Sequence, residues 1–322
     1  MLVSVLVPLF NSEEYIKDAI ESVLNQSYEN FELLVIDDGS TDKSAEIVSQ
    51  FKDSRIKLHR RNHSGLIDGL NYGLAVAKGE VIARFDNDDI CLEGRLKNQI
   101  SFLKGHPDVG VVAGGAYLID ETGKIRKSIS MPEHHDDISH CLESFFNPII
   151  HPAVVIRKDI LSSLGGYGKR FQAAEDYDLW LRLLRKGIKF HNLPYPIIKL
   201  RKHSKNMSMV QLKSSTRSCF FSLFEHFFWK KNRVEITALT WDLQEQLMKK
   251  AEGIILDTGL IETWCWRVKV RENLKTDPLG SFIDIGKSLF DINKWGIVFN
   301  RKRKIVSRME SMVERVGFEK NK

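Results

Sequence analysis

The chain has 322 residues, 43% of them hydrophobic and 28% charged, a composition typical of globular proteins. No run approaches the roughly 18 apolar residues that a membrane-spanning helix needs, and the four cysteines form neither a CxxC pair nor a secretory framework. The net charge of +6 resides in residues 287–322, which hold ten basic and four acidic residues. Enzymes acting on nucleic acids more often place basic residues around the active cleft, so this distribution argues against nucleic acid as a partner.

The apolar start, MLVSVLVPLF, has no basic n-region and no small-residue cleavage site, so it predicts a first strand and not a signal peptide. The widely spaced cysteines favour reduced thiols. We therefore expect a cytoplasmic protein.

Short apolar runs alternate with amphipathic segments over the first hundred residues. We predict strands over 2–8, 31–37, 55–60 and 80–86, separated by helices that end near Asn25, Phe51 and Gly79. Asn11, with Glu14 three residues later, is a cap-like signal for the start of the first helix.

This alternation predicts βαβ units and a largely parallel sheet with helices on both faces. Ligands of such sheets bind at the carboxyl ends of the strands. Pro8, the pair Asp37–Asp38 and the run Asp86–Asp88 all lie at such ends. We therefore predict the functional site at that edge.

The pattern becomes mixed after residue 105. We predict strands over 109–120 and 151–157, a helix over 174–187 and an extended segment over 188–203 that prolines interrupt. Long amphipathic helical patterns begin at about Met209. We therefore predict a catalytic domain over 1–208 and a helical extension over 209–322.

The stretch RFDNDDI, residues 84–90, places three aspartates within four positions after a buried strand. Residues two apart on a strand share a side, so Asp86 and Asp88 are expected to face one ligand. Hard divalent cations bind carboxylates and complete their shell with water and substrate phosphates. This favours a metal–diphosphate site, and the alternative is a polar turn that caps the next helix.

Asp37-Asp38-Gly39-Ser40 repeats this theme at a second strand end. A carboxylate there can accept a hydrogen bond from a nucleobase N–H or a ribose hydroxyl. The alternative is a tight turn followed by a helix cap.

Several ordered motifs resemble glycosyltransferase family 2: VSVLVPLFNSEEYIKDAIESVLNQSYENFELLVIDDGSTDKS, then GLNYGLAVAKGEVIARFDNDD, then AEDYDLWLRL. The resemblance covers about residues 1–205. It implies a GT-A-type α/β fold, a Rossmann-like mixed and mostly parallel sheet flanked by helices, here with a mainly α-helical C-terminal extension. It also implies a nucleotide-sugar donor, with a UDP-sugar favoured, and a divalent cofactor, Mn²⁺ or Mg²⁺.

The resemblance further assigns roles to residues of this chain. Asp38 would contact the base, Asp86 the ribose, and Asp88 the metal on the diphosphate. His203 would complete the metal shell, and Arg201 or Lys202 would neutralise the diphosphate, whereas a solvated basic loop is the alternative for this segment. The full set of implied donor-binding residues is Pro8, Leu9, Phe10, Asp38, Asn62, Gly65, Asp86, Asn87 and Asp88.

Displacing a diphosphate from a sugar requires an activated acceptor hydroxyl, and one carboxylate suffices as general base. The family pattern assigns this role to Asp176 in the ED motif, which implies inversion at the anomeric carbon. The alternative is that Glu175 and Asp176 only cap the helix N-terminus. For Trp180, one turn later, the sequence leaves two alternatives: its ring stacks on an acceptor sugar, or it packs in the core. His151 matches a family position near the acceptor.

The chain lacks the Q-x-x-R-W motif of processive relatives, which favours the addition of one or a few sugars. The resemblance implies a saccharide or polyprenyl-diphosphate-linked acceptor. It also implies a role in surface polysaccharide (O-antigen, capsule or lipopolysaccharide) synthesis. The C-terminal basic and aromatic helical pattern suits peripheral contact with an anionic membrane at its inner face. Packing on the catalytic domain or a homodimer contact is the alternative.

Two rival functions remain. A sugar nucleotidyltransferase should carry a glycine-rich basic loop after the first strand, whereas PLFNSEEYI is acidic and has no glycine. An inert nucleotide-sugar-binding protein should have lost a metal or base residue, whereas Asp88 and Asp176 are both present.

Overall fold

The computed structural model describes the chain except for residues 172, 204–211, 234–235, 237–243, 246–248 and 250–322. The chain divides into two compact units. The first comprises Met1–His140, Asn147–Arg170 and Arg182–Asn206, and the second comprises Cys141–Phe146, Phe171–Leu181 and Met207–Lys322. The domain boundary at 208 stays a prediction, and the basic segment 287–322 lies outside the described residues.

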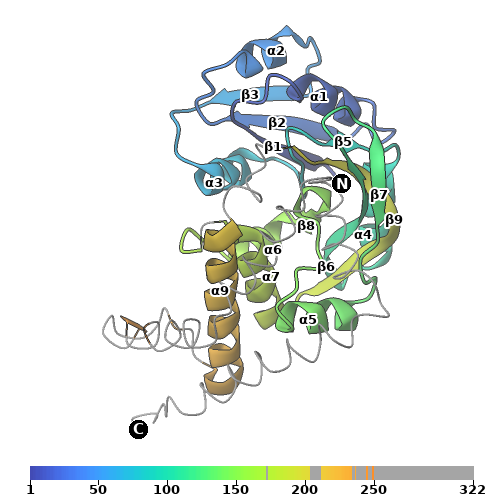
Figure 1. Ribbon diagram of the computed structural model, residues 1–322. Helices are drawn as coiled ribbons and strands as arrows, with labels where there is room; N and C mark the ends of the chain where they lie inside the picture. The colour runs from blue at the N-terminus through green and yellow to red at the C-terminus, as the bar shows by residue number, and fades with distance from the viewer. Residues whose placement is uncertain (172, 204–211, 234–235, 237–243, 246–248, 250–322) are drawn as a thin grey trace. The chain divides into compact units, whose positions relative to one another are not determined.

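One mixed sheet forms the centre of the first unit (Figure 1). Its strands are β1 (Val3–Leu9), β2 (Phe31–Asp37), β3 (Ile56–Arg60), β4 (Val81–Arg84), β5 (Ile90–Cys91), β6 (Val109–Ile119), β7 (Ile125–Ile129), β8 (Val155–Arg157) and β9 (Lys189–Arg201). Within the described residues their order is β3-β2-β1-β4-β8-β6-β9-β5, with β7 paired to β6.

The half of the sheet from β3 to β4 is parallel, as predicted. Leu9 at the end of β1 lies opposite Asp37 of β2, and Asp37 lies opposite Arg60 of β3. The carboxyl ends of these strands therefore meet at one edge of the sheet. The antiparallel strand β8, between β4 and β6, separates this half from the parallel pair β6–β9.

Helices cover both faces of the parallel half. The face formed by Val3, Val5 and Val7 shares a hydrophobic core with α1 (Ile16–Leu24), α2 (Ser44–Gln50) and α4 (Arg95–Gly105). Leu6 points to the other face and contacts Gly73 of α3 (Leu66–Val76). α6 (Lys158–Ser163) packs against β4 and β8. Burial on both faces explains why β1 is an uninterrupted apolar run.

Two predicted boundaries are wrong. The first helix begins at Ile16 rather than near Asn11, because Asn11 adopts a positive φ of 47° and its side chain accepts a hydrogen bond from Thr41 N at 2.8 Å. The predicted strand 151–157 begins with a 3₁₀ turn, His151–Ala153, and only Val155–Arg157 pairs in the sheet. In both places a local turn replaces the regular element.

The second unit is helical in its described part. It contains the end of α5 (His135–Glu143), the first two turns of α7 (Glu175–Arg185) and α9 (Leu212–Asn232). Glu143 bonds His226 at 3.0 Å and Lys230 at 2.8 Å, both on α9. Burial raises the pKa of Glu143, but these hydrogen bonds outweigh it and hold the pKa at about 2. Among the described helices, none has the length and apolar composition that a membrane crossing needs.

Gly79, just before β4, marks a close approach of two backbone segments. A Cβ there would lie 2.5 Å from Ser4 N and 2.9 Å from Leu2 O, so β1 would have to shift. We expect Gly79→Ala to lower the free energy of unfolding by about 1–3 kcal/mol in urea denaturation. Gly105→Ala is the control, because a Cβ there meets open space and should change stability by less than about 1 kcal/mol. Equal stability of the two variants would contradict this account.

Candidate active site

The acidic cluster predicted from RFDNDDI forms in a turn and not on a strand. β4 ends at Arg84, and residues 87–88 form a turn. The expectation that strand alternation aligns Asp86 with Asp88 is therefore wrong. The two carboxylates converge nevertheless, because the turn brings them together. One carboxylate oxygen from each of Asp86, Asp88 and Asp89 lies within 4.8 Å of the other two. Asp89 is not among the residues predicted from the sequence, and its only signal is its place directly after Asp88.

Burial and mutual repulsion oppose the charged form of the carboxylates in this cluster. Arg84 Nη2 lies 2.6 Å from Asp86 Oδ1. Burial raises the pKa of Asp86, with Arg84 opposing the rise and Asp88 adding to it. Burial also raises the pKa of Asp89 well above its usual value, and repulsion from Asp88 and Asp86 adds to the effect. A divalent cation bound here would favour the charged form of both carboxylates.

His203 reaches this cluster, as predicted. Its Nε2 lies 2.8 Å from Asp88 Oδ2, and its ring stacks on Tyr15 at a centroid distance of 5.1 Å. Carboxylate oxygens are the ligands that Mg²⁺ and Mn²⁺ prefer, and imidazole is a ligand typical of transition metals. The residues present therefore fit a divalent metal such as Mn²⁺.

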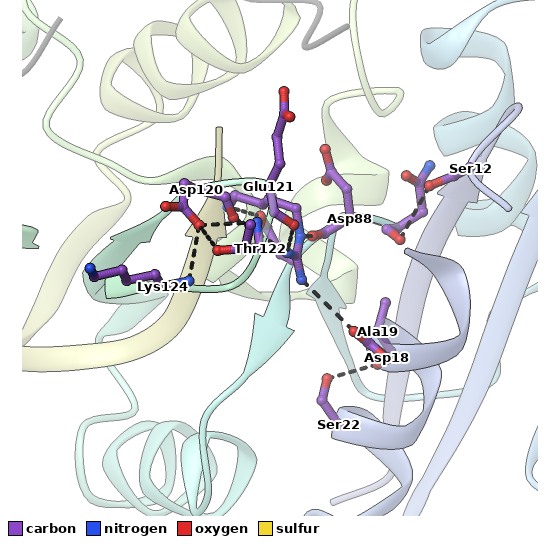
Figure 2. Close-up of polar contacts among 12 residues, drawn as sticks. Ser12, Asp18, Ala19, Ser22, Asp88, Asp120, Glu121, Thr122 and Lys124 are labelled. Atoms are coloured by element: carbon purple, nitrogen blue, oxygen red, sulfur yellow. Dashed lines mark hydrogen bonds and ion pairs between the residues drawn. The ribbon is translucent and has the colours of Figure 1, made fainter. Parts of the chain in front are cut away.

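Arg201 has a different role from the one expected of it. Its side chain is 4% exposed, and Nε donates to the Asp88 carbonyl at 2.8 Å. Nη1 donates to the Glu121 carbonyl at 2.9 Å in the β6–β7 turn, beside Asp88 in Figure 2. The guanidinium also lies 4.7 Å from the Tyr15 ring centroid. Arg201 thus fixes the turn that carries the acidic cluster, and Lys202 remains the candidate to neutralise a diphosphate.

We expect Arg201→Met to lower the free energy of unfolding by about 2–3 kcal/mol, because the carbonyls of Asp88 and Glu121 lose a charged donor. We also expect weaker Mn²⁺ binding, by about 10- to 100-fold. Urea denaturation and metal titration measure the two effects. Arg126→Met, in the neighbouring strand β7, is the control, because Arg126 is 40% exposed and its ion pair with Asp120 should contribute less than about 1 kcal/mol. Wild-type metal affinity in Arg201→Met would contradict the positioning role.

Asp38, at the end of β2, bonds the loop that follows β3. Oδ1 accepts hydrogen bonds from Ser64 N at 2.8 Å and Ser64 Oγ at 3.0 Å. Oδ2 accepts one from Gly65 N at 2.8 Å and lies 2.9 Å from His63 Nδ1. Asn62, in the same loop, is exposed. Gly65 thus contacts Asp38 directly, and the donor-binding roles of Asp38, Asn62 and Gly65 stay predictions.

The end of β1 borders both features. The Pro8 carbonyl accepts a hydrogen bond from Asn87 Nδ2 at 2.8 Å, which ties β1 to the acidic turn. The Leu9 side chain is buried in the core, so only its backbone reaches the site, where its carbonyl bonds Asp38 N. Phe10 is 44% exposed, and its ring lies 4.5 Å from that of His63. Phe10 thus presents an exposed apolar ring at the edge of the sheet where the functional site is predicted.

Of the residues expected at the acceptor side, Asp176 belongs to the second unit, and its Oδ1 accepts a hydrogen bond from Tyr177 N at 2.7 Å. Its role as general base stays a prediction. Trp180 is fully buried, so of its two alternatives the core role is correct. His151 is also buried, with Nε2 3.0 Å from the Tyr167 hydroxyl.

Residues 4–165, about half of the chain, match the model of glycosyl transferase family 2. The chain belongs to this family and is a glycosyltransferase. It is 34% identical over 212 residues to the O-antigen biosynthesis glycosyltransferase WbnJ of Escherichia coli, covering 64% of this chain and 81% of WbnJ. It is 36% identical over 204 residues to the amylovoran biosynthesis glycosyltransferase AmsE of Erwinia amylovora, covering 62% of this chain and 75% of AmsE.

Solved structures show the same fold. S. aureus TarS 1–349 in complex with UDP-GlcNAc superposes with a TM-score of 0.61 at 18% identity, over 98% of this chain and 91% of that one. The mannosyltransferase PcManGT from Pyrobaculum calidifontis, in complex with GDP-Man and Mn²⁺, gives 0.53 at 18% identity, over 98% and 85%. The predicted GT-A-type fold is thereby confirmed.

Proposed function

We propose that the chain transfers a sugar, with inversion, from a nucleotide-diphosphate donor to a saccharide or lipid-linked saccharide acceptor in surface polysaccharide synthesis. The observation that carries the donor half is the convergence of Asp86, Asp88 and Asp89 with His203 at the carboxyl edge of the sheet. The names of WbnJ and AmsE support the polysaccharide setting. The UDP-GlcNAc complex of TarS supports a UDP-sugar as donor.

Two groups of residues at this edge of the sheet would bind different parts of the donor. Asp88, Asp86 and His203 would hold a divalent cation, which when bound would supply positive charge to the diphosphate. Asp38 and the loop containing Asn62 and Gly65 would bind the nucleoside, with the exposed ring of Phe10 available to its base. Carboxylates alone would repel an anionic diphosphate. A bound cation would allow this acidic edge of the sheet to bind it.

Asp176 would remove the proton from the attacking acceptor hydroxyl. A single displacement forms the new glycosidic bond as the bond to the diphosphate breaks, which inverts the anomeric carbon. The chemistry needs one base on the acceptor side and one charge-neutralising site on the leaving-group side. A polyprenyl-diphosphate-linked acceptor and peripheral membrane contact through the basic segment 287–322 complete the proposal.

Thermal unfolding of the metal-depleted protein with UDP, GDP, CDP and their sugars tests the donor site. A ligand that binds only the folded state adds about 2.7 kcal/mol of stability at a hundredfold excess over Kd. The proposal expects a shift with one nucleotide that requires Mn²⁺ or Mg²⁺. A shift that needs no metal, or no shift with any nucleotide, would overturn the metal–diphosphate assignment. Pyrophosphate release from a nucleoside triphosphate and a sugar phosphate would instead indicate the nucleotidyltransferase.

A further inference from the structure

A second group of metal-ligating side chains lies in the first unit, outside the acidic cluster. Glu133 and His134 stand in the segment between β7 and α5, and His191 is the third residue of β9. The acidic cluster lies near the opposite end of β9, where Arg201 bonds Asp88. The β6 partners of His191 and Arg201 are Val112 and Ile119, which are seven residues apart, or about 23 Å at the usual rise per residue. The two groups are therefore independent.

The donor atoms of this group converge. One ligand atom from each of Glu133, His134 and His191 lies within 4.8 Å of the other two. His191 Nε2 is 3.8 Å from Glu133 Oε1, and the two imidazole rings have centroids 6.1 Å apart. The His191 side chain is 12% exposed and that of Glu133 39%, so a cation can reach the group while part of it is shielded from water.

The backbone and a neighbouring ring hold the group in place. Asn192 N donates to the Glu133 carbonyl at 3.0 Å, and Asn192 Nδ2 donates to the Pro132 carbonyl at 2.6 Å. These two bonds tie the segment carrying Glu133 to β9 beside His191. Phe102 of α4 stacks on the His191 ring at a centroid distance of 4.0 Å and fixes its plane. A site held this way needs little reordering to bind a metal.

We propose that Glu133, His134 and His191 form a second cation site, selective for Zn²⁺ or a similar transition ion. Two imidazoles and one carboxylate are a donor set that Zn²⁺ favours, with water in the remaining position. The acidic cluster offers three carboxylates and one imidazole, which suits Mn²⁺ or Mg²⁺. The second site joins the segment 130–134 to β9, and it does not depend on the proposed transferase reaction.

Zn²⁺ titration of the full-length, metal-depleted protein tests this site in the Asp88→Asn background, which disables the acidic cluster. We expect one Zn²⁺ to bind, and His134→Ala in that background to weaken the binding at least tenfold. His134 is exposed, so its removal should leave the fold intact. His106→Ala is the matched control, because His106 also stacks on Phe102, at 4.0 Å, but is not a ligand of the group.

Co²⁺ provides a second readout, because its visible absorption reports coordination geometry. We expect low-coordinate Co²⁺ bands in the Asp88→Asn protein that disappear in the variant that also carries His134→Ala. Failure of the Asp88→Asn protein to bind Zn²⁺ would overturn the proposal. Equal Zn²⁺ affinity with and without His134 would also overturn it. Neither result bears on the donor site.

Discussion

Asp88→Asn is expected to lose metal-dependent nucleotide binding and to lower turnover by about 10²–10³-fold. The carboxylate lies between the other acids of its cluster and His203 Nε2, at 2.8 Å, so its removal breaks the proposed metal shell at its centre. A metal ion that neutralises a leaving diphosphate contributes several kcal/mol, and each 1.4 kcal/mol is about a factor of ten in rate.

The same variant should fold normally, which keeps this result interpretable. Arg201 bonds the carbonyl of Asp88 and not its side chain, so the anchor of the turn survives the substitution. Loss of one carboxylate also relieves repulsion on Asp86 and Asp89. Thermal unfolding should therefore show no loss of stability without ligand and no nucleotide shift with Mn²⁺. Asp159→Asn, an exposed acid in α6, serves as the control. A wild-type Mn²⁺-dependent shift in Asp88→Asn would remove this residue from the site.

Asp176→Asn is expected to lower turnover by about 10²–10⁴-fold while donor binding stays unchanged, because a general base acts on the acceptor and not on the nucleotide. Asparagine retains an oxygen in the place of Oδ1, which accepts a hydrogen bond from Tyr177 N at 2.7 Å. The start of α7 should therefore keep its structure.

Steady-state kinetics with saturating acceptor, together with nucleotide binding by thermal shift, separate the two variants. Asp88→Asn should fail in both measurements, whereas Asp176→Asn should fail only in turnover. If Asp176→Asn keeps activity within about tenfold of wild type, Asp176 is not the general base. Its role is then the alternative that the sequence leaves open, a cap of the helix N-terminus.

Local patterns predicted the parallel half of the sheet, because β1, β2 and β4 are buried on both faces and therefore appear as largely apolar runs. β5, with two residues, is too short to produce such a pattern, and β8 forms only the last three residues of the strand predicted over 151–157. Their pairing depends on partners more than 40 residues away in the sequence: Cys91 of β5 lies opposite Ile198, and Val155 of β8 lies opposite Val112. Sequence alone carries no such register.

The residues of the candidate site could be predicted where a sequence motif identifies them. Roles that depend on contacts between distant parts of the chain could not. Asp86, Asp88 and His203 converge as expected, although a turn and not a strand aligns the two acids. The structural role of Arg201 depends on the carbonyl of Asp88, 113 residues earlier. Trp180 shows the same limit, since its helical spacing fits a sugar platform and a core position equally well.

The four contacts to Asp38 bear on which nucleobase the protein can accept. A carboxylate has about four acceptor positions, and Ser64 and Gly65 donate to three of them, while His63 Nδ1 lies 2.9 Å from Oδ2 and also contacts the Asp38 carbonyl at 3.1 Å. In the proposed donor complex, a base that bonds this carboxylate competes with these groups. A base edge that presents an N–H, such as the imide of uracil, replaces the lost hydrogen bond one for one. An edge that presents only lone pairs leaves the displaced group unsatisfied and adds repulsion, at a cost of about 1–3 kcal/mol. Discrimination between bases then arises from this exchange, without any residue that contacts one base alone.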